Sequence, residues 1–479
     1  MILAASLLVP FAATASSGDD VVEACYGTAG DAPVVNARVC RSAEQVVKGL
    51  GRTCRVALPA EPCRTVDGRL ISSALVDSYA ASWVPRALKL QRGIDDDVPL
   101  ANELWVHTHN TFNAEAYSPT LSGLDPNQIY SITDQMRMGI RAIEIDVHWA
   151  PSLDGLPADG GMAPIVCHGT EEVIGPLRIH VGCTIEVHLR VRLAEVRAWL
   201  ARPENADEVL LVYLENQMDD NPTAHLRASE AISSTLGDLV YRPSGTGCQP
   251  LPLDVTRAQI RASGKRVLLT GNCGPGAWTS WVFERGPRWR ESSSEEGTDY
   301  PDYPACVAAE RVPNDYDHNW IRSFEDSTWL SAMLDGGRQA TEITAVEAGR
   351  MVRCGVDMIG FDQLQPFDPR LDAVVWSWAV DEPSTTTASS CAFAGSDGRF
   401  RAGDCGAPRV FACVSPLGDW SVQGPAGAWT EGVARCAAAG ATFAVPRTGY
   451  ENELLKGVSG AETWLDYRVL GGVWTPQAA

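Results

Sequence analysis

The chain has 479 residues, of which 45% are hydrophobic and 21% are charged, and its 60 acidic and 39 basic residues give a formal net charge of -21. This length and composition exclude a single small module, a chain that is disordered throughout and a collagen-like repeat. The acidic balance excludes nucleic-acid binding driven by a positive surface field, so we expect no nucleic-acid partner.

Residues 1–15 have the pattern of a secretory signal peptide. A short apolar run from Ile2 to Ala13 ends in Ala13-Thr14-Ala15, whose small residues suit a cleavage site, although no basic residue precedes the run. The run is too short to span a bilayer, and no later stretch reaches about 18 uncharged apolar residues. We therefore expect a secreted, extracellular protein without a permanent membrane anchor.

The 14 cysteines indicate structural disulfides in an oxidising compartment. They are even in number, contain no CxxC pair and do not cluster with His at the spacing of a zinc site. The simplest interpretation joins each cysteine to its neighbour in the sequence: Cys25 with Cys40, Cys54 with Cys63, Cys167 with Cys183, and so on along the chain. Spacing alone leaves this connectivity open.

The chain divides into three parts after the signal peptide. Residues 16–97 form a Cys-rich segment of mixed polarity, with its clearest helical period around residues 71–90, and we assign no chemistry to it. In residues 98–372, short apolar runs alternate with amphipathic stretches, which is typical of parallel strands joined by crossover helices. Residues 373–479 hold four more cysteines, several Trp and many Gly and Ala, so we predict a separate disulfide-bonded module.

The middle part predicts an α/β fold. The strands expected there are Glu103–His109, Arg141–His148, Pro164–His168, Val209–Glu215, Arg266–Gly271 and Val356–Phe361, and the helices expected between them are Ile132–Met138, Val187–Leu200 and Thr223–Leu236. About 275 residues of this alternation suit a single TIM-type β/α barrel. A Rossmann sheet is the alternative, but no GxGxxG motif follows any of these strands.

Four successive strands of this barrel end in polar side chains. The four ends are His107-Thr108-His109-Asn110, Glu144-Ile145-Asp146-Val147-His148, His168-Gly169 and Glu215-Asn216. The period of two puts Glu144, Asp146 and His148 on one face of their strand, and it puts His107 and His109 on one face of theirs. The active site of a β/α barrel forms at these strand ends. Taken alone, each histidine is more often a hydrogen-bonded core residue than a catalyst.

The strand ends also predict a calcium site. Two carboxylates on one inward strand face repel each other in a low-dielectric interior unless a cation or a base offsets them. Ca²⁺ takes oxygen ligands, and no Cys lies at these strand ends to favour a softer metal. The oxygen ligands on offer are those of Asn110, Glu144, Asp146 and Glu215. Two histidines beside such a cation suit general acid and base catalysis, and no GxSxG or P-loop motif supplies another nucleophile or phosphate cradle.

Together these pieces resemble the catalytic X-type barrel of phosphatidylinositol-specific phospholipase C. The matching stretches are HTHNTFN (107–113), GIRAIEIDVHW (139–149), PIVCHGT (164–170) and EVLLVYLENQ (208–217). Their order, strand placement and residue types agree with the family over residues 106–236, and the rest of the barrel agrees more loosely.

The resemblance implies roles for the strand-end residues. His109 would stabilise the pentavalent phosphorane, and His168 would be the general acid that protonates the departing alkoxide. Glu215 would help to deprotonate the inositol 2-hydroxyl, whose attack gives a cyclic inositol phosphate. The implied calcium ligands are Asn110, Glu144, Asp146 and Glu215. Calcium-independent bacterial members use a basic residue in place of the metal, whereas this chain keeps all four oxygen ligands.

The remaining residues bear on the substrate. Asp362 and Gln363, at a late strand end, are predicted to bind sugar hydroxyls, while His107 and His148 receive supporting or structural roles. The animal enzymes hold extra ring phosphates with Lys and Arg, but the only Lys in the barrel body is Lys265, at the start of a strand. We therefore expect a calcium-dependent phosphodiesterase that acts on phosphatidylinositol or glycosylphosphatidylinositol-type lipids at a membrane surface.

Two alternative functions stay open. A glycerophosphodiester phosphodiesterase has the same barrel, a metal and two histidines, but it usually pairs its first His with Glu, where this chain has Asn110. The other alternative is a non-catalytic surface-binding protein, against which the intact His109 and His168 argue.

The C-terminal module resembles part of a C-type lectin-like domain. CAFAGSDGRFRAGDC (391–405) and RVFACV (409–414) match its second half, and RCAAAGATFAVPRTGYENELL (435–455) matches its first half, so the order is permuted or comes from broken repeats. The resemblance implies that Cys391 pairs with Cys405 and Cys413 with Cys436. A glycan partner and a structural role both stay open for this module, because the calcium-and-sugar motif of true lectins is not clearly present.

Overall fold

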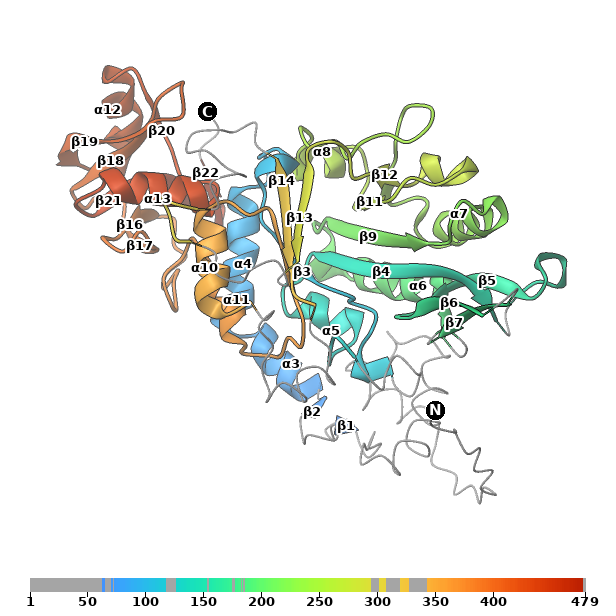
Figure 1. Ribbon diagram of the computed structural model, residues 1–479. Helices are drawn as coiled ribbons and strands as arrows, with labels where there is room; N and C mark the ends of the chain where they lie inside the picture. Colours follow the sequence, from blue (N-terminus) through green and yellow to red (C-terminus); the bar gives the residue numbers. More distant parts are fainter. Residues whose placement is uncertain are drawn as a thin grey trace.

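The computed structural model consists of a curled sheet with helices outside it and a smaller β-rich module at the C-terminal end of the chain (Figure 1). It describes residues 63–64, 70–71, 73–117, 126–152, 155–174, 177–181, 183, 186–293, 301–306, 319–326 and 343–476. No helix within these residues is long and apolar enough to cross a membrane. The predicted signal peptide and the expected pairs Cys25–Cys40 and Cys54–Cys63 lie outside the described side chains.

The core of the molecule is a parallel sheet with the strand order β10-β11-β9-β4-β3-β15-β14-β13. In chain order these strands are β3 (Trp105–Thr108), β4 (Ala142–Pro151), β9 (Leu210–Gln217), β10 (Val240–Tyr241), β11 (Val267–Gly271), β13 (Trp289–Ser293), β14 (Trp320–Phe324) and β15 (Met358–Phe361). Neighbours in this order pair parallel throughout. The predicted α/β class is therefore confirmed, and the curled sheet is consistent with a TIM-type barrel.

A strand does form at the expected third strand, Pro164–His168, but it runs antiparallel to its neighbours in the sheet, so its expected parallel place in the barrel is wrong. β5 (Met162–Val166) instead pairs antiparallel with the end of β4 and with β8 (Val187–His188). The chain turns back at Gly160 and Gly161, whose φ angles of 68° and 79° suit glycine. A short apolar run fits either direction of pairing, so the run alone could not reveal this hairpin.

Side-chain contacts link β13 to the strands at the other end of the curled sheet. β12 (Phe283–Glu284) extends the edge of β11, and no backbone ladder joins β12 to β13 in the described part of the chain. The rings of Tyr213 and Trp289 stack with their centroids 5.8 Å apart. Arg285 Nη1 donates to Glu291 Oε2 at 2.8 Å. The first contact joins β9 to β13, and the second joins the residue after β12 to β13.

Helices cover the outside of the sheet. They are α3 (Ser73–Ala80), α4 (Trp83–Ile94), α5 (Ile132–Arg137), α6 (Leu189–Leu200), α7 (Pro222–Leu236), α8 (Arg257–Ala262), α10 (Ala345–Arg353) and α11 (Pro369–Ala373). Asn221 starts α7 by accepting hydrogen bonds from the N–H groups of Thr223 and Ala224. α5, α6 and α7 lie where helices were expected, except that α6 begins at Leu189 because the two preceding residues form β8.

Two small hairpins lie apart from the main sheet. β1 (Cys63–Arg64) pairs antiparallel with β2 (Leu70–Ile71) ahead of α3. β6 (Thr170–Ile174) pairs antiparallel with β7 (Leu177–Val181) between β5 and β8.

The C-terminal module has a sheet of its own with the strand order β17-β16-β21-β18-β19. Its strands are β16 (Ser390–Ala394), β17 (Phe400–Asp404), β18 (Arg409–Val414), β19 (Trp420–Gly427), β20 (Thr442–Phe443), β21 (Thr463–Leu470) and β22 (Val473–Pro476), and its helices are α12 (Gly432–Ala438) and α13 (Gly449–Val458). The pairing is antiparallel except between β18 and β21. The module therefore differs in architecture from the parallel barrel.

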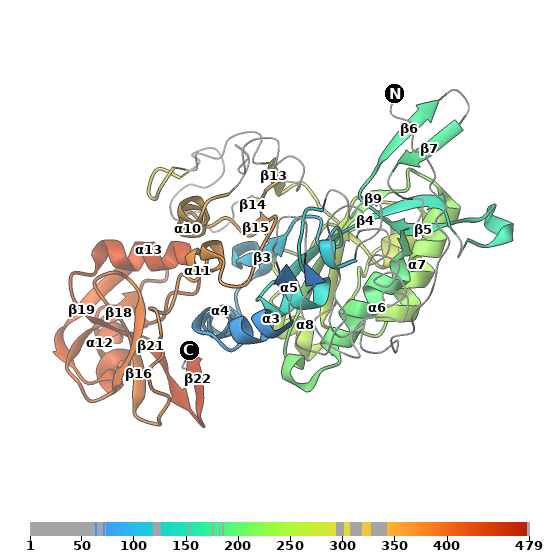
Figure 2. The same ribbon diagram turned by 90° about the horizontal axis from the view of Figure 1, so that it is seen from below.

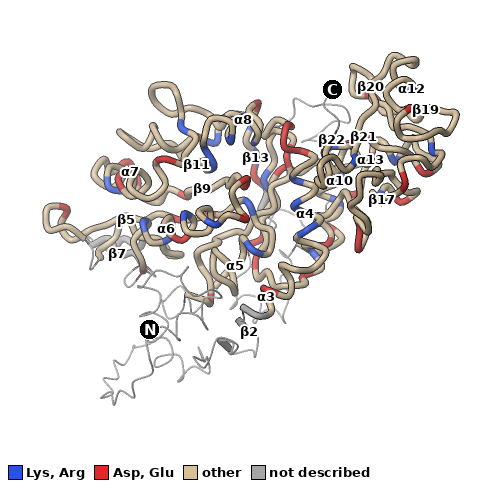
Figure 3. The backbone as a smooth tube through the Cα atoms, turned by 180° about the vertical axis from the view of Figure 1, so that it is seen from behind, with Lys and Arg blue, Asp and Glu red and all other residues tan. Residues whose placement is uncertain are grey.

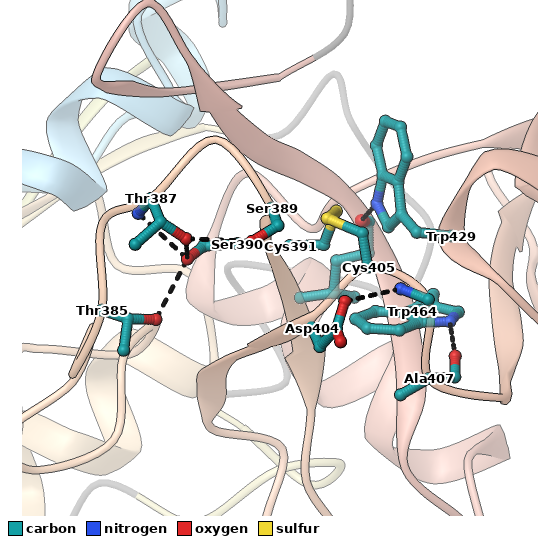
Figure 4. Close-up of a disulfide and its surroundings, with 12 residues drawn as sticks. Thr385, Thr387, Ser389, Ser390, Cys391, Asp404, Cys405, Ala407, Trp429 and Trp464 are labelled. Carbon is teal, nitrogen blue, oxygen red and sulfur yellow. Dashed lines mark hydrogen bonds between the residues drawn. A yellow bond between two sulfur atoms is a disulfide. The ribbon is translucent and has the colours of Figure 1, made fainter.

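Disulfides join sequence neighbours, as the spacing predicted. The described bridges are Cys167–Cys183, Cys248–Cys273, Cys306–Cys354, Cys391–Cys405 and Cys413–Cys436. Figure 4 shows Cys391–Cys405, which ties β16 to the residue after β17. Neighbour pairing is thus confirmed for these ten cysteines.

The module packs directly against the barrel. Figure 2 shows it beside α4, α10 and α11. Gln91 of α4 donates from Nε2 to Val374 O at 3.2 Å and accepts the N–H of Trp376 on Oε1 at 2.9 Å. α13 approaches α10 so closely that a Cβ on Gly449 would lie 2.5 Å from Val352 Cγ1. The two parts therefore share a buried, hydrogen-bonded boundary.

Candidate active site

The residues predicted to carry the chemistry line one cavity of about 350 Å³ at the carboxyl ends of the parallel strands. They are His109, Asn110, Glu144, Asp146, His168 and Glu215. β3, β4 and β9 are neighbours in the sheet, and parallel neighbours end at the same edge, so they bring five of these residues together. The sixth, His168, arrives from the hairpin that β5 forms with β4.

Three carboxylates form the centre of this cavity. The register of β4 and β9 sets Asp146 directly beside Glu215, and one oxygen from each of Glu144, Asp146 and Glu215 lies within 4.8 Å of the others. Burial and the charges of Glu215 and Glu144 raise the pKa of Asp146, and burial and Glu144 raise the pKa of Glu215. Such a cluster binds protons or a cation to offset its charge.

Asn110 adds an amide to this cluster. Its φ of 44° is a left-handed conformation that Asn tolerates better than most residues. Its Nδ2 donates to Asn127 Oδ1 at 3.2 Å, and the other end of the amide lies 3.2 and 3.1 Å from the two Asp146 oxygens. If the amide were rotated by 180°, its N–H would donate to Asp146. In the present orientation the amide oxygen faces the Asp146 oxygens, and a cation between them would relieve their repulsion. Three carboxylates and one amide oxygen fit Ca²⁺, which takes about six to eight oxygen ligands.

Arg322 of β14 is a site residue that the sequence prediction missed. Its buried guanidinium donates from Nη2 to Glu144 Oε2 at 2.6 Å and from Nη1 to Glu291 Oε1 at 3.0 Å. The site therefore holds a fixed basic residue together with the four oxygen-bearing side chains that were predicted as calcium ligands. The signal that could have found it is an Arg inside the short apolar run Trp320–Phe324, since a buried Arg needs a carboxylate partner.

His109 is held by a carboxylate behind it. Its Nδ1 lies 3.3 Å from Asp362 Oδ2, and both side chains are buried. Burial opposes the charge of His109, but Asp362 and Glu144 outweigh it and raise the pKa of His109 to about 9. His107, two residues earlier, behaves in the opposite way, because burial and the charges of Arg322 and His109 lower its pKa well below the usual value. His109 is therefore the charged histidine of the pair at neutral pH.

His168 is positioned by a disulfide. It is half-buried and lines the cavity, and the preceding Cys167 is buried in its bridge to Cys183. His148, at the point where β4 leaves the barrel, lines the same cavity. The β4–β5 hairpin thus brings two histidines to the site.

Asp362 and Gln363 do not line the cavity. Besides its contact with His109, Asp362 accepts hydrogen bonds from Gln128 Nε2 at 3.0 Å and Asn127 Nδ2 at 3.3 Å. Gln363 donates to the carbonyl of Asn127 at 3.0 Å. These contacts show that Asp362 holds His109 and that both residues hold the segment around Asn127. That they bind sugar hydroxyls stays a prediction.

The rim of the cavity comes from strands and turns that the sequence did not predict. Arg285, after β12, donates to Asn272 Oδ1 and to Glu291 of β13. Carboxylates outnumber guanidinium groups in the lining, five to two: Glu144, Asp146, Glu215, Glu291 and Asp326 against Arg285 and Arg322. Elsewhere acidic and basic positions are mixed along the chain (Figure 3), so the cavity is a local concentration of acidic charge.

Comparisons with known proteins identify the family of this chain. A family model described as the Rv2075c PI-PLC-like domain matches residues 68–368. Two Mycobacterium tuberculosis proteins, the uncharacterized proteins Rv2075c and MT2135, are each 38% identical to this chain over 432 residues, which covers 86% of this chain and 85% of each relative.

Solved structures of bacterial phospholipases are also similar. Phosphatidylinositol-specific phospholipase C from Listeria monocytogenes is 16% identical, with a TM-score of 0.35, and the match covers 58% of this chain and 94% of that chain. A Staphylococcus aureus phosphatidylinositol-specific phospholipase C is 12% identical, with a TM-score of 0.40, and the match covers 62% of this chain and 98% of that chain.

Proposed function

This chain belongs to the Rv2075c PI-PLC-like domain family, and we propose that it is a calcium-dependent phosphodiesterase that cleaves phosphatidylinositol or glycosylphosphatidylinositol-type lipids. The observation that carries the proposal is the convergence of two histidines and four oxygen ligands in one cavity. The nucleophile would be the inositol 2-hydroxyl, because an attacking group within the substrate avoids the entropy of ordering a second reactant.

The electrostatics of the cavity support a divalent cation. Five carboxylates against two guanidinium groups would repel a phosphodiester anion, and a cation between the central carboxylates would reverse that repulsion. Asn110, Glu144, Asp146 and Glu215 would hold the ion. When bound, calcium supplies positive charge to the phosphate oxygens and favours ionisation of the 2-hydroxyl.

Three side chains would move or hold protons. Glu215, the least buried of the three carboxylates, would take the proton of the 2-hydroxyl as its oxygen bonds to phosphorus. Charged His109, held at Nδ1 by Asp362, would donate its other N–H to a phosphoryl oxygen. His168 would give a proton to the departing glycerol oxygen as the phosphorus–oxygen bond breaks. A cyclic inositol phosphate and diacylglycerol would result.

The rim bears on the head group. Asp326 and Glu291 line the cavity, and Glu291 is already paired with Arg285 and Arg322. A ring phosphate placed there would meet acidic groups without a free basic partner among the described lining residues. An inositol without further phosphates, with or without an attached sugar, therefore suits the cavity better than a polyphosphorylated inositide.

We further propose that the protein acts outside the cell. The ten cysteines whose side chains the structure describes lie in disulfides, which persist in oxidising compartments. The signal peptide expected at residues 1–15 and the glycan partner expected for residues 373–479 stay predictions.

Phosphorus NMR of phosphatidylinositol micelles tests the reaction directly. We expect a cyclic phosphodiester resonance when the protein is incubated with millimolar calcium, and none with chelator or with the variant His168→Ala. A linear inositol or glycerol phosphate as the first product would instead support a glycerophosphodiesterase. Equal turnover with calcium and with chelator would refute the proposed calcium dependence. Arg322 would then be the basic group that contacts the phosphate.

A further inference from the structure

His107 is a buried histidine that the proposed chemistry does not use. It lies on β3 with 0% exposure, and neither ring nitrogen has a hydrogen-bond partner among the described residues. A buried polar group without a partner costs free energy. The presence of this ring in the core therefore calls for an explanation.

One carboxylate of the proposed calcium site, that of Glu144, lies close to this ring. His107 Nε2 lies 3.5 Å from Glu144 Oε2, slightly beyond hydrogen-bond distance. The same oxygen accepts the N–H of Asn110 at 3.2 Å and Nη2 of Arg322 at 2.6 Å. Donors thus converge on one oxygen of Glu144, which leaves the other oxygen, Oε1, for the ion.

The other side of the ring is closed by the neighbouring strand. Gly360 of β15 pairs in register with His107, and a Cβ on Gly360 would lie 2.6 Å from His107 Nδ1 and 2.8 Å from the Phe324 Cβ. Only glycine leaves room for the imidazole there, and the ring cannot retreat from Glu144 towards β15. The lack of a side chain at Gly360 therefore lets the ring of His107 fit beside the carboxylate of Glu144.

We propose that His107 is a positioning residue for Glu144, with its Nε2–H donating to Oε2 and holding Oε1 towards Asp146 and Glu215. This inference rests on the proposed calcium site and names a residue outside its ligand set. His107 contacts neither the ion nor the substrate in this role. Neighbours of this kind fix ligand orientation before the metal arrives, and their loss commonly weakens metal affinity by about 10- to 100-fold.

Calcium titration by calorimetry tests the proposal on the full chain. His107→Phe keeps a ring of similar size without a donor, and we expect it to bind calcium at least about tenfold more weakly than wild type. His107→Gln can still offer an N–H to Glu144 and should recover most of the affinity. Gly360→Ala should weaken binding by displacing the ring. Thermal unfolding in chelator is the control, and it should show the phenylalanine variant to be no less stable than wild type.

Each other result counts against the inference. Equal affinity of His107→Phe and wild type would overturn it, and so would equal losses in the phenylalanine and glutamine variants, since packing alone would then explain them. Failure of wild type to bind calcium would instead refute the proposed calcium site, and this inference with it. Nitrogen-15 NMR of wild type without metal gives an independent check: we expect the ring proton of His107 on Nε2, and a proton on Nδ1 would overturn the proposal even if the variants failed to fold.

Discussion

The two ends of the barrel hold buried carboxylates in opposite circumstances. At the amino end, Glu208 accepts hydrogen bonds from Nε and Nη2 of Arg141, both at 2.8 Å, and from Arg92 at 3.3 Å. At the carboxyl end, the three central carboxylates have one close guanidinium contact among them in the described structure, from Arg322 to Glu144. Similar residues are thus paired at one end and left in excess at the other.

The pKa values follow the same division. Burial opposes the charge of Glu208, but Arg141 and Arg92 outweigh it and hold its pKa well below the usual range. Burial and like charges instead raise the pKa values of Asp146 and Glu215. The difference teaches that arginines of the chain neutralise the buried carboxylate at the amino end. At the carboxyl end, a bound proton or cation must neutralise the excess carboxylates. Unpaired buried charge of this kind marks a functional site.

Removing a catalytic group at the carboxyl end should have the largest effect. His168→Ala should lower turnover by up to about ten-thousandfold, because the leaving alkoxide loses its general acid, while the urea midpoint stays close to wild type. His148→Ala is the matched control, since it removes a histidine that lines the same cavity, and it should retain most turnover. Similar losses in both variants would contradict the distinct role of His168.

Breaking an ion pair at the amino end should lower stability and leave turnover unchanged. Glu208→Ala leaves the Arg141 guanidinium buried without its carboxylate, so we expect a loss of about 3–5 kcal/mol in the free energy of unfolding. Turnover per folded molecule should be unchanged. In wild type, the stability from the depressed pKa of Glu208 should be present above about pH 4.5 and be lost as the pH falls towards its folded-state value. A stable but inactive Glu208→Ala variant would remove the distinction between the two ends.

Calcium should stabilise the folded protein through the carboxylates at the carboxyl end of the barrel. At about one hundred times its dissociation constant, calcium should raise the free energy of unfolding by about 2.7 kcal/mol, which thermal unfolding with and without chelator would measure. Asp146→Asn should abolish this gain and, without calcium, should be slightly more stable than wild type because one repelling charge is gone. An undiminished calcium effect in Asp146→Asn would place the ion elsewhere.

Asp362 offers the smallest and sharpest test. Wild-type activity should fall above about pH 9, where His109 loses its proton. The same raised pKa stabilises the folded protein below about pH 6.5, and this contribution is lost as the pH rises through about 9. In Asp362→Asn the attraction that raises the pKa of His109 is gone, so the alkaline limb of kcat/KM should move down by about one to two pH units. If the alkaline limb of kcat/KM did not move, the ionisation behind it would belong to a group other than His109.

Much of the site could be predicted because it lies at the ends of strands that the sequence marks clearly. Apolar runs ending in His109, Asp146 and Glu215 belong to β3, β4 and β9, and neighbouring parallel strands bring their ends together. The rest depends on contacts that no local pattern encodes. Arg322 lies 178 residues from Glu144 in the sequence, and Asp362 lies 253 residues from His109.

The limits of the fold prediction have a similar cause. A five-residue apolar run fits both parallel and antiparallel pairing, so β5 could not be assigned its direction. The strands β13 and β14 are short, and their place in the barrel depends on partners far along the chain. The described disulfides were predictable because each joins two cysteines that follow one another in the sequence, 14 to 48 residues apart.

The contact of Gly449 with Val352 bears on where this chain can be truncated. The family match ends at residue 368, yet Gln91 and Val352 of the barrel are bonded or packed to residues beyond that point. The end of the family match is therefore not a folding boundary. The barrel and its C-terminal module should melt in one transition, and a gene truncated near residue 372 should yield insoluble protein in place of a trimmed enzyme.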